Sequence, residues 1–289
     1  MRILVTGAAG FIGRHVCNVL QKAHHEVIGL DAVPLMGGNW EETVQADVTK
    51  PLPIIDRLDA VIHLAAIAAP RECDKDPGRA FDVNVNGTLQ VLRMALASGA
   101  RKVVFSSSAH VYGVGPRYLP TDESHPVSLG NTYTTTKILG EELCRLYLEN
   151  HGLSYTTLRL FNVYGQGQSL GYFIPDQIAK REIRLQGGNT TKDWVFVEDV
   201  ARAFVLATET SYVGPLNIGT GIETQLAPIA RFIAERTGAT FESTDAADAT
   251  RMQANAARAG RVLGWHPTVN VWEGLRACLD QAKEPAIRP

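Results

Sequence analysis

Three glycines, spaced three residues apart, stand between an apolar strand and a helix near the start of the chain. Glycines in such a turn let a pyrophosphate approach the backbone at the positive end of the following helix. The stretch TGAAGFIG therefore predicts a dinucleotide site directly after the first strand. The residues expected to contact the cofactor in this turn are Gly7, Gly10, Phe11, Ile12 and Gly13.

The second predicted strand, 26–30, is followed by an acidic residue, Asp31. A carboxylate at this position accepts hydrogen bonds from the adenosine ribose and repels a 2′-phosphate. No arginine follows it in the next residues, AVPLMGG, so NAD(H) is favoured over NADP(H) as the cofactor. The alternative is a surface aspartate beside a turn that is only structural.

Apolar strands alternate with amphipathic helices through the first 165 residues, which predicts a parallel sheet covered on both faces. The expected fold class is α/β, a doubly wound parallel sheet (Rossmann fold) with a smaller C-terminal α/β substrate lobe. We expect an NAD-binding domain over 1–165, with about 194–219 returning to it, and a substrate-binding lobe over 166–289. The strands of the sheet are expected at 2–6, 26–30, 43–47, 59–65, 102–105 and 155–160.

Two further strand ends are expected to line the cofactor. Asp47 and Val48 end the third strand and are predicted to lie near the adenine. For Asp47, a cap that only terminates the strand is the alternative. Leu64, Ala65 and Ala66 follow the fourth strand, where small apolar residues let the backbone approach the cofactor.

The candidate catalytic residues lie in two segments, SSSAHVYG (106–113) and YTTTK (133–137). The first follows the strand KVVF, so Ser108 is expected at the carboxyl edge of the sheet. Tyr133 and Lys137 are four residues apart and share one face of a predicted helix. A nearby ammonium and a positive nicotinamide ring favour the phenolate, which makes the tyrosine a usable base.

These motifs occur in an order that resembles the extended short-chain dehydrogenase/reductase family, over about residues 1–220. The closest resemblance is to its nucleotide-sugar epimerases, of the UDP-glucose 4-epimerase kind. It implies that Ser108 hydrogen-bonds the reacting sugar hydroxyl, Tyr133 acts as acid or base, and Lys137 binds the nicotinamide ribose. Other roles implied by the resemblance are a structural asparagine, Asn84, and contacts to the nicotinamide and the sugar diphosphate from Phe161, Asn162 and Val163.

The residue after Ala109 departs from part of the family. Members that dehydrate or decarboxylate sugars usually carry glutamate at the position of His110. The absence of this glutamate argues against dehydration and decarboxylation and favours oxidation and reduction at one carbon. His110 is expected either to contact the substrate and shape sugar specificity or only to pack beside the strand end.

The cations expected to bind the nucleotide also depart from the family pattern. Lys192, in the stretch KDWVFVEDV, stands where the epimerases usually carry an arginine that reaches the diphosphate. Lysine keeps the charge but loses the bidentate geometry. Arg251 is the first candidate for a further phosphate ligand and Arg258 the second, with a solvated surface charge as the alternative for each.

The leading hypothesis is an NAD-dependent nucleotide-sugar epimerase that oxidises C4 transiently and returns hydride to the opposite face. The alternatives are a sugar or alcohol dehydrogenase or keto-sugar reductase with net cofactor turnover, and a non-catalytic NAD-binding protein.

A net charge of −2 gives no general attraction to nucleic acid or membranes. Four scattered cysteines suggest reduced thiols in a cytoplasmic protein without a metal site. Apolar stripes on the helices expected at 77–98 and 131–150 suggest a homodimer, or else buried helices of a monomer.

Overall fold

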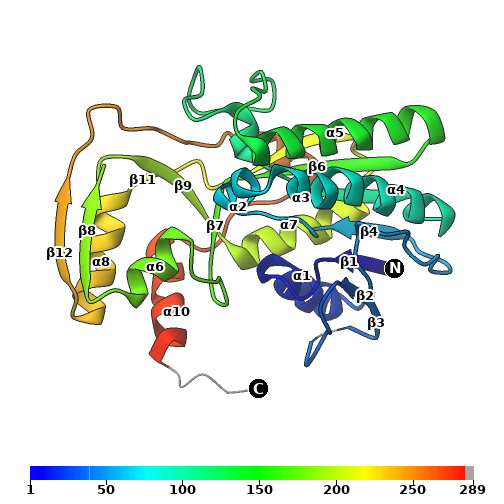
Figure 1. Cartoon of the computed structure of the whole chain (residues 1–289), viewed down its shortest axis with the longest axis horizontal. Helices are drawn as coiled ribbons and strands as arrows, with labels where there is room; N and C mark the ends of the chain where they lie inside the picture. Colours follow the sequence, from blue (N-terminus) through cyan, green and yellow to red (C-terminus); the bar gives the residue numbers. More distant parts are fainter. Residues whose placement is uncertain (39, 284–289) are drawn as a thin grey trace.

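A seven-stranded parallel sheet forms the centre of the larger lobe in the computed structural model, which describes residues 1–38 and 40–283 (Figure 1). The strand order is β10-β6-β5-β4-β1-β2-β3. The chain therefore runs outward from β1 in both directions, and the crevice between β1 and β4 lies where the order reverses. The strands are β1 (Arg2–Thr6), β2 (Glu26–Asp31), β3 (Glu42–Gln45), β4 (Ala60–His63), β5 (Lys102–Ser108), β6 (Ser154–Leu160) and β10 (Gly214–Ile218).

Helices cover both faces of this sheet, as Figure 1 shows. Along β1, Ile3 and Val5 belong to the core cluster on one face and Leu4 to the cluster on the other. This alternation buries successive side chains on opposite faces, which confirms the predicted doubly wound fold. One face is covered by α1 (Phe11–Lys22) and α7 (Val197–Glu209), with α9 (Ala257–Leu263) beside β10. On the other face lie α2 (Pro70–Lys75), α3 (Pro77–Phe81), a π-helical turn (Asp82–Asn86), α4 (Gly87–Ala97) and α5 (Thr132–His151).

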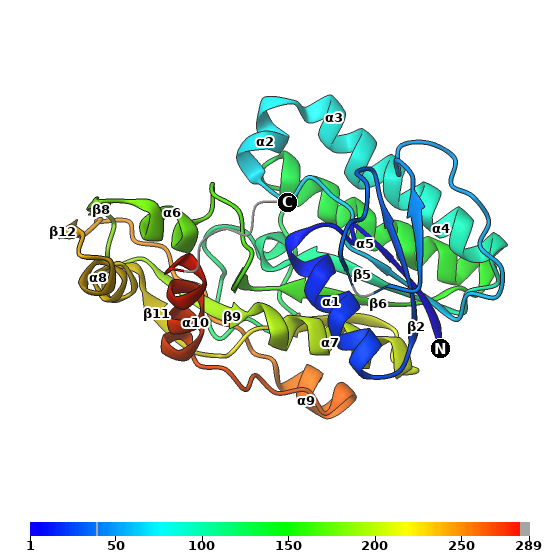
Figure 2. The same ribbon diagram turned by 90° about the horizontal axis from the view of Figure 1, so that it is seen from below.

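The smaller lobe extends from one end of the sheet, at the left of Figure 2. It contains a three-stranded sheet of order β11-β9-β7 and a parallel pair, β12 and β8. Aromatic side chains such as Tyr164, Trp194 and Phe196 fill its core. Its elements are β7 (Asn162–Tyr164), α6 (Phe173–Ala179), β8 (Glu182–Gln186), β9 (Thr191–Phe196), β11 (Glu223–Gln225), α8 (Leu226–Thr237), β12 (Thr240–Thr244) and α10 (Val271–Lys283).

The segment expected to return to the larger lobe is divided between the two lobes. β9 does not join the large sheet, because it pairs in parallel with β7 and antiparallel with β11. α7, which follows directly, packs beside α1, and β10 pairs with β6. Only the part of 194–219 that begins with α7 therefore lies on the large sheet.

Two predicted elements differ from the observed ones in a way that concerns the site. The third strand ends at Gln45 instead of 47, so Asp47 lies in the loop after it. The single helix expected over 77–98 is interrupted by the π-helical turn, in which the Asn84 side chain is buried. Such turns often mark functional positions in helices.

All four cysteines are buried and free, as the expectation of reduced thiols requires. Within 1–38 and 40–283, no helix has the length and apolar character needed to cross a membrane. Over the same described ranges, no cluster of three or more His, Cys, Asp or Glu side chains is arranged to hold a metal ion.

Candidate active site

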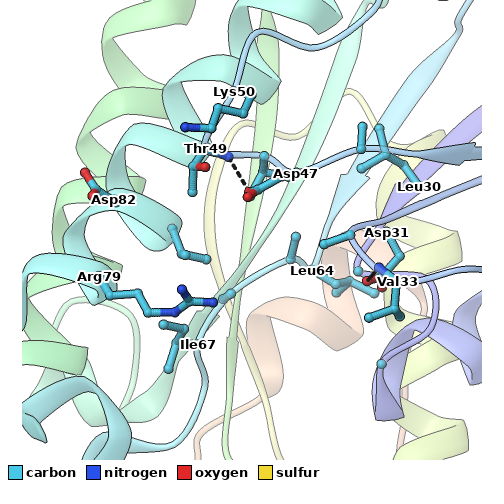
Figure 3. A pocket seen from close by; sticks show the side chains of 18 of the residues that line it. Leu30, Asp31, Val33, Asp47, Thr49, Lys50, Leu64, Ile67, Arg79 and Asp82 are labelled. Atoms are coloured by element: carbon cyan, nitrogen blue, oxygen red, sulfur yellow. Dashed lines mark hydrogen bonds between the residues drawn. The ribbon is translucent and has the colours of Figure 1, made fainter. Parts of the chain in front are cut away.

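A cavity of about 940 Å³ lies at the carboxyl ends of β1, β2 and β4 (Figure 3). The glycine turn forms one wall. Gly7 has φ +71°, and a Cβ atom there would lie 2.7 Å from the backbone nitrogen of Ala65. At Gly13 a Cβ would lie 2.1 Å from the Gly7 carbonyl oxygen, so both positions exclude side chains. Gly7 and Gly10 line the cavity, whereas Phe11, Ile12 and Gly13 begin α1 beside it.

Asp31 presents its carboxylate to this cavity from the end of β2. Its Oδ2 accepts a hydrogen bond from the Ala9 backbone N–H (3.0 Å) and its Oδ1 accepts one from that of Val33 (3.3 Å). The carboxylate is thereby fixed beside the glycine turn with acceptor capacity remaining for ribose hydroxyls. An NAD molecule fits this combination of an acidic strand end, a tight glycine turn and a large adjoining cavity.

The opposite wall is formed by the loops after β3 and β4. Asp47 accepts a hydrogen bond from the Thr49 N–H (2.9 Å), and this bond is the main reason that the pKa of Asp47 is lowered. Asp47 therefore caps its loop and also lines the cavity, so the two interpretations do not exclude each other. The other predicted residues that line the cavity are Val48, Leu64, Ala65 and Ala66.

Ser108, Tyr133 and Lys137 converge at the carboxyl end of β5. The Ser108 side chain lies close enough to the Tyr133 hydroxyl to lower its pKa, and the Ser108 Oγ accepts a hydrogen bond from the His110 backbone N–H (3.2 Å). Lys137 donates from Nζ to the Ser106 carbonyl oxygen (2.8 Å). Its Nζ lies 5.8 Å from the centre of the Tyr133 ring, on the same helix face as the sequence spacing predicts.

The electrostatics of this cluster are dominated by burial. Burial raises the pKa of Tyr133, and the nearby Ser108 side chain only partly opposes this effect. Burial also lowers the pKa of Lys137 to about 8. The lysine alone therefore does not bring the tyrosine into the useful range, and the positive nicotinamide ring named with it in the prediction is also required.

Asn84 connects the cofactor wall to the catalytic helix. Its Oδ1 accepts a hydrogen bond from the Ile67 N–H (2.8 Å), and its Nδ2 donates to the Ile67 carbonyl (3.1 Å) and to Thr136 Oγ1 (3.0 Å). The side chain is buried, and its contacts bridge separate elements. This geometry agrees with the structural role that the resemblance implied.

His110 lies beside Tyr133, and Lys192 lies close to His110. The His110 ring stands edge-on to the Tyr133 ring, with centroids 6.2 Å apart. Burial lowers the pKa of His110, and the positive charge of Lys192 lowers it further. Burial also lowers the pKa of Lys192, whose half-buried ammonium has no hydrogen bond or ion pair with any residue of 1–38 and 40–283.

The two arginines considered for phosphate binding are already paired with carboxylates. The exposed Arg251 contacts both carboxylate oxygens of Glu223, at 3.0 Å and 2.5 Å. Arg258 lies 3.4 Å from the buried carboxylate of Glu123. Both guanidinium groups thus have carboxylate partners, unlike the Lys192 ammonium, which has none among residues 1–38 and 40–283.

The remaining predicted contacts follow β6 where the chain crosses into the smaller lobe. Phe161 is buried, and Asn162 and Val163 are half-buried in β7. Asn162 donates from Nδ2 to the Asp193 carbonyl oxygen (3.2 Å). This bond places Asn162 beside the residue that follows Lys192, at the boundary between the lobes.

The sequence of the chain also matches known proteins. Residues 3–219 match the model of the NAD dependent epimerase/dehydratase family. The chain belongs to this family.

Individual members of the epimerase/dehydratase family resemble the chain along nearly its full length. UDP-glucose 4-epimerase of Mycolicibacterium smegmatis is 35% identical over 310 residues, which cover 97% of this chain and 98% of the relative. UDP-glucuronic acid decarboxylase 6 of Arabidopsis thaliana is 31% identical over 301 residues, covering 95% of this chain and 87% of the relative. The solved structure of MoeE5 with UDP-glucose and NAD has a TM-score of 0.88 at 28% identity, covering 98% of this chain and 99% of that one.

One network in this member of the epimerase/dehydratase family was not predicted from the sequence. Glu141 accepts a hydrogen bond from Ser107 Oγ (2.6 Å) and pairs with Arg159 (2.6 Å). Arg159 also donates to the Tyr112 hydroxyl (3.1 Å), which donates to Asn217 Oδ1 (2.6 Å). The only signal in the sequence is that Glu141 stands four residues after Lys137, on the same helix face.

Two further residues beside Tyr133 were also missed. Cys73, on α2, packs in the same small cluster as Tyr133, and its thiol donates to the Ile67 carbonyl oxygen (3.4 Å). Tyr172, just before α6, is close enough for its hydroxyl to influence the pKa of Tyr133. Neither residue belongs to a recognisable motif, because distant segments bring them to the site.

Proposed function

We propose that the protein is an NAD-dependent epimerase of a nucleotide sugar, acting by transient oxidation at C4. The observation that carries this proposal is the position of Ser108 next to Tyr133 at the carboxyl end of β5, with Tyr133 packed against Ile67 of the NAD-type cavity. The absence of a carboxylate at position 110 supports simple oxidation and reduction over dehydration or decarboxylation.

In this proposal the residues at the end of β5 manage the proton of the sugar hydroxyl. Ser108 hydrogen-bonds the reacting oxygen and orients it toward the Tyr133 hydroxyl. Tyr133 takes the proton and later returns it, while Lys137 holds the nicotinamide ribose and contributes positive charge. NAD supplies the reversible hydride acceptor, and its positive ring adds the charge that favours the phenolate.

The two lobes divide the substrates between them in this proposal. The domain over 1–165, completed by α7 and β10, binds NAD through Asp31 and the glycine turn. The lobe over 166–289 holds the nucleotide part of the sugar, with Lys192 and Asn162 facing its phosphates. We further propose that the enzyme works in the cytoplasm.

A homodimer is part of the proposal as well. Helices α4 and α5 carry partly exposed apolar side chains, among them Leu96, Leu139 and Leu146. A helical interface between two copies would cover them. Light scattering of the purified protein tests this: a monomer at micromolar concentration would contradict it.

The experiment that tests the function is NMR of the products after incubation with NAD and a panel of UDP-, GDP- and dTDP-sugars. Inversion at C4 without net NADH is the expected outcome, and it names the substrate. Tyr133→Phe serves as the control and should lose turnover while still binding NAD. Accumulation of NADH with an oxidised product would establish the dehydrogenase alternative instead.

A further inference from the structure

Arg79 reaches into the cofactor cavity from α3. The carboxylate of Asp76, which precedes the helix, accepts a hydrogen bond from the Arg79 backbone N–H (3.0 Å) and fixes the start of this turn. In Figure 3 the Arg79 side chain extends toward Leu64, with Ile67 below it. Asp31 and Val33 lie on the opposite side of the cavity.

The guanidinium of Arg79 forms no ion pair or side-chain hydrogen bond with any residue in the described ranges 1–38 and 40–283. Its charge reaches Asp47 only as a weak contribution to the lowered pKa of that carboxyl. Some arginines of the chain are paired with carboxylates, for example Arg101 with Asp59, whereas Arg79 is not. An arginine that lines a ligand cavity without such a partner leaves its planar face and its donors available to the ligand.

The surroundings indicate which part of the ligand it meets. The pyrophosphate is expected at Gly7 and Gly10, next to Asp31, which is the side of the cavity away from Arg79. With its ribose at Asp31, the adenine would lie across Leu64 toward the loop of Asp47, since all three residues line the same cavity. Arg79 therefore lies beside the base and away from the phosphates.

We propose that Arg79 stacks its guanidinium on the adenine of NAD and thereby strengthens retention of the cofactor. Planar guanidinium groups stack on aromatic faces, and at an exposed residue such as Arg79 the contact is modest. The proposal rests on the NAD site of the proposed function. It assigns the base-stacking role to a residue outside the glycine turn and the acidic strand end.

Binding measurements on the purified protein test this proposal directly. Calorimetric titration of the wild type, Arg79→Ala and Arg79→Lys with NAD and with AMP is compared with competition by nicotinamide mononucleotide. Arg79→Ala should weaken NAD and AMP by roughly two- to fivefold, while the mononucleotide is unaffected. Arg79→Lys should recover only part of the loss, because lysine keeps the charge without the planar face.

Arg71→Ala is the matched control, since Arg71 is an exposed arginine on α2 that does not line the cavity. Equal NAD affinity of Arg79→Ala and the wild type would overturn the role of Arg79 alone. Full recovery by Arg79→Lys would also overturn it, because a charge contact would then suffice. Failure of the wild type itself to bind NAD would refute the cofactor site, a result distinct from both.

Discussion

Burial of the Lys137 side chain lowers its pKa to about 8 in the folded protein. The ammonium is therefore charged below pH 8 and loses its proton as the pH rises through that value, well below the usual pKa of about 10.4 for a lysine. Since the positive charge is proposed to assist Tyr133, kcat/KM should fall as the pH rises above about 8. The pH–rate profile of the wild-type protein measures this decline.

A variant that cannot lose its charge separates Lys137 from other titrating groups. In Lys137→Arg, the guanidinium stays charged at every accessible pH, so the decline above pH 8 should disappear even if the maximal rate is lower. An unchanged decline in that variant would show that another group causes it.

His110 offers a second test at the level of one side chain. If its imidazole contacts the sugar, His110→Thr should change kcat/KM for individual nucleotide sugars unequally, by roughly tenfold for the one most affected. Tyr133→Phe is the comparison, because it should lower turnover of every accepted sugar alike. A uniform effect of His110→Thr across the panel would assign His110 to packing beside Tyr133.

Between elements, the pair formed by Arg159 on β6 and Glu141 on α5 joins the catalytic helix to the sheet. Their side chains are 7% and 13% exposed, so removing one partner leaves a nearly buried charge. Arg159→Leu should lower the free energy of unfolding by about 3–5 kcal/mol. The double variant Glu141→Leu/Arg159→Leu should lose less than the sum of the single variants, as denaturant titration can measure.

Arg145 on the same helix provides the control for this pair. It contacts Glu142 and Glu149 at 2.8 and 2.6 Å, but its side chain is 46% exposed. Water screens such pairs, and Arg145→Ala should change the free energy of unfolding by only about 0.5 kcal/mol. A loss at Arg145 equal to that at Arg159 would contradict the argument from burial.

The elements that sequence predicts well are those whose signals are local. The glycine turn, Asp31 and the YTTTK spacing each specify their own geometry, and the structure brings them to one edge of the sheet. β9 was assigned to the wrong sheet because its partner β7 has only three residues and forms by a bend after β6. The Ser107–Glu141–Arg159 network escaped prediction because its members come from β5, α5 and β6 and meet only after folding.

For the whole molecule, the two-lobe arrangement predicts that each ligand stabilises a different region. NAD at one hundred times its dissociation constant should raise the free energy of unfolding by about 2.7 kcal/mol. Hydrogen exchange should slow in the segments that line the cofactor cavity, 7–10, 31–33, 47–50 and 64–67. Added nucleotide sugar should then slow exchange around 192, and protection there by NAD alone would contradict the proposed division of the lobes.

The position of β10 affects the order in which the chain can fold while it is being synthesised. β10 pairs with β6, yet residues 161–213, including much of the smaller lobe, lie between these two neighbouring strands. A nascent chain that has left the ribosome only as far as Leu160 therefore carries β6 as an open edge, with unpaired backbone groups along one side. The edge closes only when residues 214–218 emerge, so the order of translation makes completion of the larger lobe wait for much of the smaller one.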